Sequence, residues 1–111
     1  MFKNFLINFN GQIYSVSVSI DMIDDLIKFI KFIEQRFNVN YERYKIAIKV
    51  LNAAKNEIQN NIKTYKPTKA EIKATIDVLK EIKTYNVSNE QERQYIDNVA
   101  EYVKSLIDNM K

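Results

Sequence analysis

The residues that most enzymes use for nucleophilic, acid–base or metal chemistry are scarce in this chain of 111 residues. It contains no Cys and no His, which removes thiolate and imidazole chemistry, zinc sites, disulfides and Ser–His–Asp triads. The single glycine, Gly11, leaves no glycine-rich loop that could cradle a phosphate. We therefore expect no enzyme, no catalytic residue, no cofactor and no small-molecule substrate.

Carboxylates remain as possible acids, bases or metal ligands, and three of them cluster at Asp21, Asp24 and Asp25. Oxygen ligands of this kind can bind Mg²⁺ or Ca²⁺, but the spacing fits no calcium loop, which also needs a central glycine. The cluster stands where a helix is expected to begin, and carboxylates stabilise the positive end of a helix dipole. We interpret it as helix capping and predict no metal site.

Positive charge is concentrated in one segment of the chain. Residues 41–66 hold six basic and two acidic side chains, whereas residues 86–111 hold three basic and five acidic ones. Lysine neutralises phosphates and asparagine bonds phosphate oxygens or base edges, so a face rich in both predicts a nucleic-acid contact. The alternative is a solvated face in a chain rich in Lys and Asn. The residues concerned recur at helical spacing, with an arginine just before them: Arg43, Lys45, Lys49, Asn52, Asn56, Asn60 and Lys63.

Aromatic side chains offer a third kind of site, an anchor for a protein partner. Phe29 and Phe32, together with Arg36, lie outside the main apolar stripe of their predicted helix. Tyr95 and Tyr102 stand one heptad apart, and a phenol tolerates a half-exposed position. These four aromatic residues predict a protein interface, the alternative being that they belong to the core.

Residues 1–20 predict a β-hairpin. The dipeptide Asn10-Gly11 suits a type I′ turn, in which both central residues need positive φ. Folding about this turn would place one apolar set on the same face: Phe5, Ile7, Phe9, Tyr14, Val16 and Val18. The opposite face would carry Asn4, Asn8, Ser15, Ser17 and Ser19. An isolated hairpin is marginal in water, so we expect its apolar face to pack on helices, while its edge could pair with another chain.

Four helices are predicted after the hairpin, at residues 22–37, 41–65, 69–84 and 89–110. Pro67 separates the second from the third, because the residue before a proline avoids the α region. Short connections make consecutive helices antiparallel neighbours. The predicted core stripe of the first helix is Ile23, Leu26, Ile27, Ile30, Ile33 and Phe37, and that of the last is Ile96, Val99, Val103, Leu106 and Met110. The predicted fold is mainly α, a single domain over residues 1–111 with an N-terminal β-hairpin packed on an antiparallel bundle of about four helices.

The starts of these helices carry capping signals. Ser19 or Asp21 is expected to cap the first helix. Thr68-Lys69-Ala70-Glu71 and Ser88-Asn89-Glu90-Gln91 have the capping-box pattern and predict the starts of the third and fourth helices.

The abundance of Ile, Asn and Lys is typical of an AT-rich genome, and an origin in a virus, phage or other mobile element would fit it. Residues 4–20 carry no charge, but polar residues alternate with apolar ones, which is wrong for a membrane-spanning helix. No secretion signal is visible. We expect a soluble intracellular protein without membrane association.

Residues 5–16, FLINFNGQIYSV, resemble the opening hairpin of the small bacterial cell-division proteins that crosslink the Z-ring. In that family a helix follows the hairpin and then an Ala-rich helix, which residues 47–58 (AIKVLNAAKNEI) resemble. The resemblance covers about half the chain and implies a Z-ring-associated factor. Pro67 and the two capped helices after it depart from the single long C-terminal coiled coil of that family.

Binding to a macromolecule is the class of function that remains. The first hypothesis is a small non-enzymatic protein-interaction or oligomerisation module that binds another protein or a second copy of itself. The second is a nucleic-acid-binding protein that uses the Lys/Asn face of residues 41–65. A cell-division factor of the Z-ring kind is a third.

Overall fold

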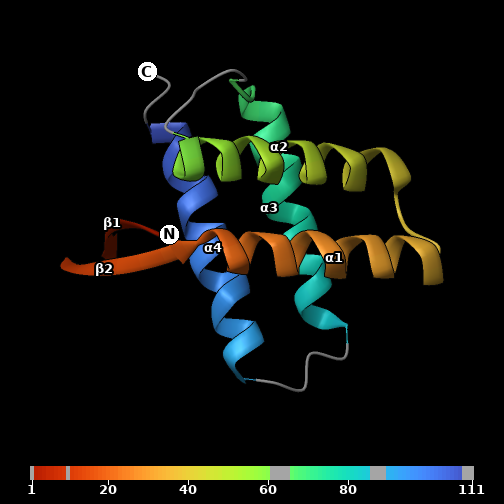
Figure 1. The fold of residues 1–111 in the computed structure, drawn as a ribbon, viewed down its shortest axis with the longest axis horizontal. Coiled ribbons are helices and arrows are strands. Elements are labelled where there is room, and N and C mark those ends of the chain that lie inside the picture. The colour runs from red at the N-terminus through yellow and green to blue at the C-terminus, as the bar shows by residue number, and fades with distance from the viewer. Residues whose placement is uncertain (1, 10, 61–65, 86–89, 109–111) are drawn as a thin grey trace.

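The computed structural model describes residues 2–9, 11–60, 66–85 and 90–108, which form an N-terminal hairpin followed by four helices (Figure 1). This confirms the predicted fold class, mainly α with a hairpin at the N-terminus.

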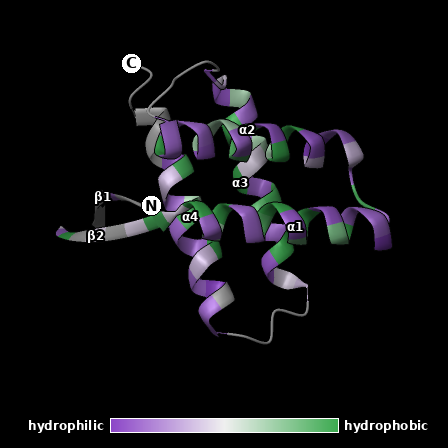
Figure 2. Cartoon of the chain, viewed as in Figure 1, coloured by the Kyte–Doolittle hydropathy of each residue, from purple (hydrophilic) through white to green (hydrophobic). Residues whose placement is uncertain are grey.

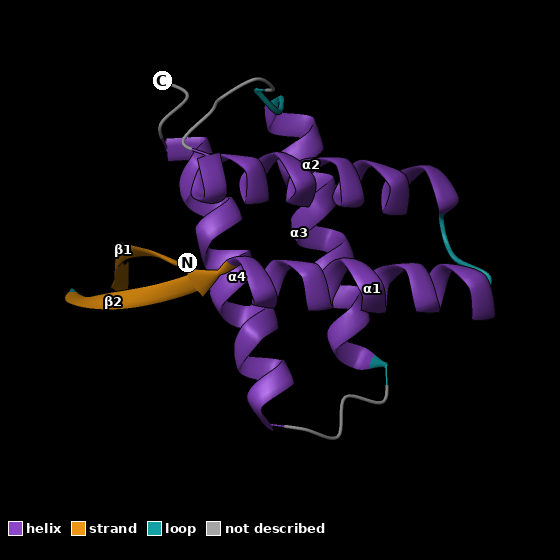
Figure 3. Ribbon diagram, in the orientation of Figure 1, coloured by secondary structure: helices purple, strands orange, loops and turns teal. Residues whose placement is uncertain are grey.

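The hairpin consists of strands β1 (Phe2–Phe9) and β2 (Gln12–Ser19), paired antiparallel (Figure 3). Its register agrees with the faces predicted from the turn, since Asn4 and Ser17, both expected on the polar face, pair directly. The Ser17 hydroxyl also donates a hydrogen bond to Asn4 Oδ1, so these two exposed side chains share a polar face as predicted. Gly11 has a φ of 81°, a conformation that glycine adopts without strain.

The hairpin joins the helices at its base, and its turn extends beyond them to one side (Figure 1). Val18 is fully buried there, and Asn98 Nδ2 donates a hydrogen bond to the Ser17 carbonyl at 3.3 Å. The strand β2 thus packs against the fourth helix as well as the first. Five side chains predicted on the apolar face lie outside the described part of the chain: Phe5, Ile7, Phe9, Tyr14 and Val16.

Helix α1 (Ile20–Arg36) begins directly after β2, two residues before its predicted start. Ser19, rather than Asp21, is the N-cap, and its hydroxyl accepts a hydrogen bond from the Met22 N–H at 3.1 Å. The last residue of the hairpin therefore caps the first helix, and no loop separates them.

Helix α2 (Tyr41–Asn60) begins at its predicted residue. Asn40 precedes it in the position of a cap, since Asn40 Oδ1 accepts a hydrogen bond from the Arg43 N–H at 3.1 Å. The predicted final residues of this helix, 61–65, lie outside the described residues.

Helix α3 (Lys69–Thr84) has its predicted bounds, and the capping box of Thr68 and Glu71 is formed. Helix α4 (Glu90–Asp108) lies within the predicted range of 89–110. The second predicted capping box begins at residues 88 and 89, which the structure does not describe.

The four helices form two crossed layers (Figure 1). α1 and α2 lie side by side and antiparallel, and α3 and α4 form a second antiparallel pair that runs across the first. Consecutive helices are thus antiparallel within each layer, as predicted, whereas α2 and α3 contact each other at a crossing between the layers.

The core lies between these layers, and hydrophobic and hydrophilic residues alternate along every helix (Figure 2). The predicted stripe of α1 is buried except for Phe37, which is 48% exposed. Phe37 follows the last helical residue, so the chain is already extended there, and its ring lies against Tyr85 with 4.8 Å between the centroids. On α4, Ile96, Val99 and Val103 are buried as predicted, while the side chains of Leu106 and Met110 lie outside the described part.

Candidate interaction surface

The exposed face of α2 carries the predicted basic and amide side chains. Helical spacing places the lysines and asparagines together, away from the core, and each described one is exposed: Lys45, Lys49, Asn52, Asn56 and Asn60. Arg43 is exposed as well, but it stands two residues before Lys45, on the opposite side of the helix. Lys63 lies outside the described residues.

Lys45 on this face is ion-paired with a carboxylate of α1. Its Nζ lies 3.2 Å from Glu34 Oε1, and the Glu34 side chain is only 10% exposed. Lys45 Nζ also lies 4.9 Å from the centre of the Tyr41 ring. Hydrogen bonding to Glu34, and next to Tyr41, raises the pKa of Lys45, so this side chain is held in its charged form.

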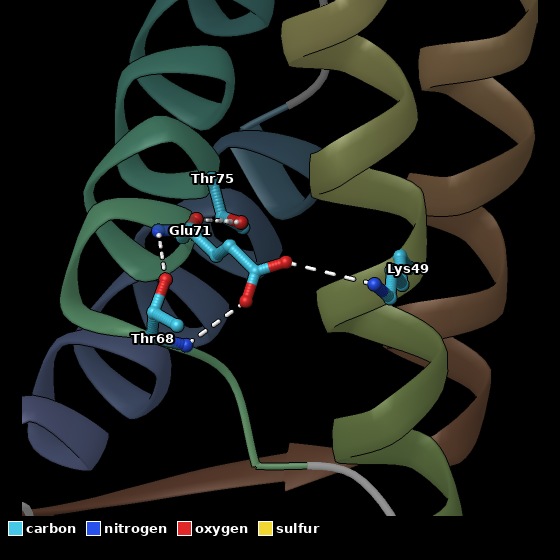
Figure 4. A network of polar contacts seen from close by, with 4 residues as sticks. All are labelled: Lys49, Thr68, Glu71 and Thr75. Carbon is cyan, nitrogen blue, oxygen red and sulfur yellow. Dashed lines mark hydrogen bonds and ion pairs between the residues drawn. The ribbon is translucent and has the colours of Figure 1, made fainter.

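Lys49 belongs to a polar network that joins α2 to the start of α3 (Figure 4). Its Nζ lies 3.7 Å from Glu71 Oε2. Glu71 Oε1 accepts a hydrogen bond from the Thr68 N–H at 3.0 Å, and the Thr68 hydroxyl accepts one from the Glu71 N–H at 3.1 Å. The Thr75 hydroxyl donates to the Glu71 carbonyl at 2.8 Å. Glu71 therefore caps α3 and also anchors it to α2.

A third lysine of α2, Lys55, lies 2.8 Å from Asp24 Oδ1 on α1. Together with the pairs of Lys45 and Lys49, this contact places acidic groups of neighbouring helices beside three of the positive charges of α2. The excess of positive charge in residues 41–66 is therefore partly compensated in the fold, because acids from other segments lie beside it.

A second exposed surface follows α1, where Phe29 and Phe32 stack with 6.5 Å between ring centres and 18° between ring planes. Phe29 is partly buried against the core, whereas Phe32 is 45% exposed. The Arg36 guanidinium lies over the Phe32 ring, 4.7 Å from its centre. One turn before Phe29, Asp25 is exposed. We refer to Asp25, Phe29, Phe32 and Arg36 as the α1 strip.

A hollow of about 320 Å³ opens beside this strip, between α1 and α4. Its lining combines buried aliphatic residues with half-buried aromatic ones and one exposed carboxylate: Asp25, Leu26, Phe29, Tyr95 and Ile96. The Tyr95 hydroxyl accepts a hydrogen bond from Gln91 Nε2 at 2.8 Å. The fold thus brings Phe29 and Tyr95, two of the predicted interface residues, to one site.

Tyr102 does not belong to this surface, which corrects its prediction as an interface residue. It is 1% exposed, and its hydroxyl donates a hydrogen bond to Glu57 Oε2 at 3.4 Å. Burial, and next the negative charge of Glu57, raises the pKa of Tyr102. Heptad spacing puts Tyr95 and Tyr102 on one face of α4, but only Tyr102 is fully buried and hydrogen-bonded to Glu57 of α2.

Asp25 was not predicted as part of an interaction site, because its neighbours Asp21 and Asp24 suggested helix capping. With the cap at Ser19, Asp25 lies beyond the first turn of α1 and lines the hollow instead. Successive residues of the α1 strip are four, three and four positions apart, from Asp25 through Phe29 and Phe32 to Arg36. This helical spacing is the signal that assigns Asp25 to the same face.

Among the described residues, no group of three or more acidic, Cys or His side chains could hold a metal ion. No helix in the described ranges is both long and apolar enough to cross a bilayer. Comparison of the chain with protein families, with curated proteins and with solved structures yields no match.

Proposed function

We propose that the chain is a small non-enzymatic protein-interaction module that docks its partner on the α1 strip and the adjoining hollow. The observation that carries this proposal is the stacked pair of Phe29 and the 45% exposed Phe32 at the edge of a hollow that aliphatic and aromatic side chains line together with Asp25. Aromatic anchors beside a pocket are the usual centre of a protein interface. Arginine and aromatic residues are also enriched at such surfaces, and Arg36 supplies both a charge and a planar contact.

Two charges flank the aromatic pair and would orient the partner. Asp25 lies at one end of the strip and Arg36 at the other, and both are exposed. Opposite charges at the rim of an interface steer encounter and select the register of binding. A matching partner therefore carries an apolar centre with a cation at one end and an anion at the other.

The test uses Phe32→Ser with Ile13→Ser as its matched control. Ile13 is an exposed apolar residue of the hairpin, 68% exposed, and lies on a different element. The chain and both variants are used for affinity capture from the source organism. We expect Phe32→Ser to lose the captured protein at least tenfold, and Ile13→Ser to retain it. Equal capture by the wild type and Phe32→Ser, with both folded by circular dichroism, contradicts the proposal.

Nucleic-acid binding through α2 is a second candidate, supported by the exposed lysines and asparagines that helical spacing places on one face, Lys45, Lys49, Asn52 and Asn56. The ion pairs of Lys45 and Lys49 with Glu34 and Glu71 weaken it, because those carboxylates compete with phosphates. The proposal predicts binding that falls steeply with salt, roughly one released counterion for each phosphate contact. If Lys45→Glu combined with Lys49→Glu leaves a mobility shift at low salt unchanged, this candidate fails.

A cell-division role of the Z-ring kind is supported by the resemblance of residues 5–16 to the opening hairpin of that family and by the pairing of β1 with β2. The second half of the chain differs from that family, because α3 and α4 pack back on α1 and α2 as a second layer.

A further inference from the structure

We propose that the partner bound by the α1 strip is a second copy of this chain, whose own α1 packs against the strip in antiparallel orientation. This inference rests on the proposed function of the strip and specifies its partner.

The arrangement of the strip is self-complementary. Its residues are separated by four, three and four positions, a spacing that reads the same in both directions. Asp25 and Arg36 are equally distant from the midpoint between residues 30 and 31, and so are Phe29 and Phe32. A two-fold axis through this midpoint therefore places Asp25 opposite Arg36 of the second copy and Phe29 opposite its Phe32. Such an isologous contact closes on itself and produces a dimer.

The charges select the antiparallel orientation. A parallel pairing of two strips would bring Asp25 against Asp25 and Arg36 against Arg36, whereas the antiparallel one forms two opposite-charge pairs. The stretch from Asp25 to Arg36 spans about 16 Å along the helix, so both pairs can form while the rings meet between them. Alternating steps of three and four residues are also the spacing with which two helices pack along their length.

The centre of this contact would be aromatic. Phe29 and Phe32 are already stacked in one chain, and the second copy adds two more rings next to them. Because Phe29 lines the hollow between α1 and α4, Phe32 of the second copy would lie at the mouth of that hollow, near Tyr95. The cation–π contact of Arg36 with its own Phe32 holds the guanidinium at the edge of the strip, where Asp25 of the second copy would lie.

The contact uses one face of one helix, so it buries less than the roughly 800 Å² per partner of a standard interface. We expect a weak dimer, with a dissociation constant on the order of 100 μM, that weakens further in high salt because its two ion pairs lie at the rim.

Charge exchange tests the pairing directly. Asp25→Arg and Arg36→Asp each place like charges opposite one another in a homodimer, and each should weaken self-association at least tenfold in sedimentation equilibrium. An equimolar mixture of the two variants should associate like the wild type. In the mixed dimer, the arginine introduced at position 25 faces the aspartate introduced at position 36, and the unchanged Arg36 of one variant faces the unchanged Asp25 of the other.

Two further variants complete this test. The double variant Asp25→Arg/Arg36→Asp should recover self-association, because both charge pairs are then reversed together. Arg43→Asp, the same charge change at an exposed site on α2, serves as the matched control and should leave the dimer unchanged.

Three results would each overturn the dimer. The first is a wild type that stays monomeric up to about 1 mM, tenfold above the expected dissociation constant. The second is a mixture of the two variants that does not associate, and the third is an Arg43→Asp variant that weakens association as much as Arg36→Asp does. The proposed function is judged separately by capture with Phe32→Ser and Ile13→Ser. A monomeric wild type that still loses a captured protein on Phe32→Ser overturns the second copy but keeps the docking surface. If Phe32→Ser changes neither capture nor self-association, both proposals fall.

Discussion

Two buried tyrosines provide a matched experiment on the core, because only one of their hydroxyls makes a hydrogen bond among the described residues. Tyr44 is fully buried and its hydroxyl makes no hydrogen bond among the described residues, although burial and then the nearby Glu81 carboxylate raise its pKa. Tyr102 is 1% exposed, and its hydroxyl donates to Glu57 at 3.4 Å. Replacing either tyrosine by phenylalanine removes the same atom. We predict that Tyr44→Phe stabilises the fold and that Tyr102→Phe destabilises it.

The magnitudes follow from these contacts. A buried polar group without a partner carries a desolvation cost of roughly 1–3 kcal/mol. Its removal also leaves a small space whose lost contacts offset part of the gain, so Tyr44→Phe should raise the free energy of unfolding by about 1 kcal/mol. The bond of Tyr102 is longer than the usual O–H···O hydrogen bond, but its acceptor is a carboxylate, so losing it should lower that free energy by about 1 kcal/mol. The two variants should therefore differ by about 2 kcal/mol, or roughly 8 °C in Tm.

Urea unfolding followed by circular dichroism measures both values, with equal m-values showing that the denatured states are comparable. The reasoning is refuted if both variants lose the same stability, or if Tyr44→Phe loses more than Tyr102→Phe. Either result would mean that the Tyr44 hydroxyl is hydrogen-bonded in solution. Burial, and next the Glu81 carboxylate, raises the pKa of Tyr44, so Glu81 would be the first acceptor to test, by a double-mutant cycle of Glu81→Leu and Tyr44→Phe.

Three further predictions concern pH, capping and the hairpin turn. Burial raises the pKa of Tyr44 and Tyr102 above the usual value of 10. The unfolded state therefore loses these protons first, so the free energy of unfolding should fall as the pH rises beyond 10. This fall should be less steep in Tyr102→Phe, and an equal slope of the free energy against pH in wild type and variant would contradict the prediction. Thr68→Ala removes the hydroxyl that accepts the Glu71 N–H, and thermal unfolding should show a loss of about 1 kcal/mol, whereas no loss would mean that the capping box contributes nothing. Gly11→Ala should lower stability by roughly 1 kcal/mol through its φ of 81° alone, because a Cβ there meets no atom within 4 Å; a neutral result in the same assay would show that the turn adopts another conformation in solution.

The local elements were predictable because short-range physics specifies them. The hairpin register follows from one turn and an alternating pattern, and it agrees with the pairing of Asn4 with Ser17. The capping box at Thr68 set the start of α3, and the buried stripe of α1 was visible from its spacing down to Ile33. Phe37 was assigned wrongly to that stripe, because periodicity alone does not show where the helix ends.

The site was only partly predictable. Aromatic character and spacing outside the core stripe identified Phe29 and Phe32, but Tyr95 and Tyr102 were indistinguishable by pattern. Their difference depends on the packing of the helices, which buries Tyr102 with its hydroxyl bonded to Glu57 of α2 and leaves Tyr95 at the hollow. In the same way, the positive segment of residues 41–66 looked uncompensated until the fold placed Glu34 and Glu71 beside it.

By itself, the amino-acid sequence determined the hairpin, the bounds of α3 and the apolar stripes. These properties depend on residue types and on neighbours within a few positions. The tertiary structure alone decided which stripes face each other, that two antiparallel pairs cross, and which exposed residues remain once the layers are packed. Such outcomes depend on contacts between residues far apart in the chain, and no local pattern records them.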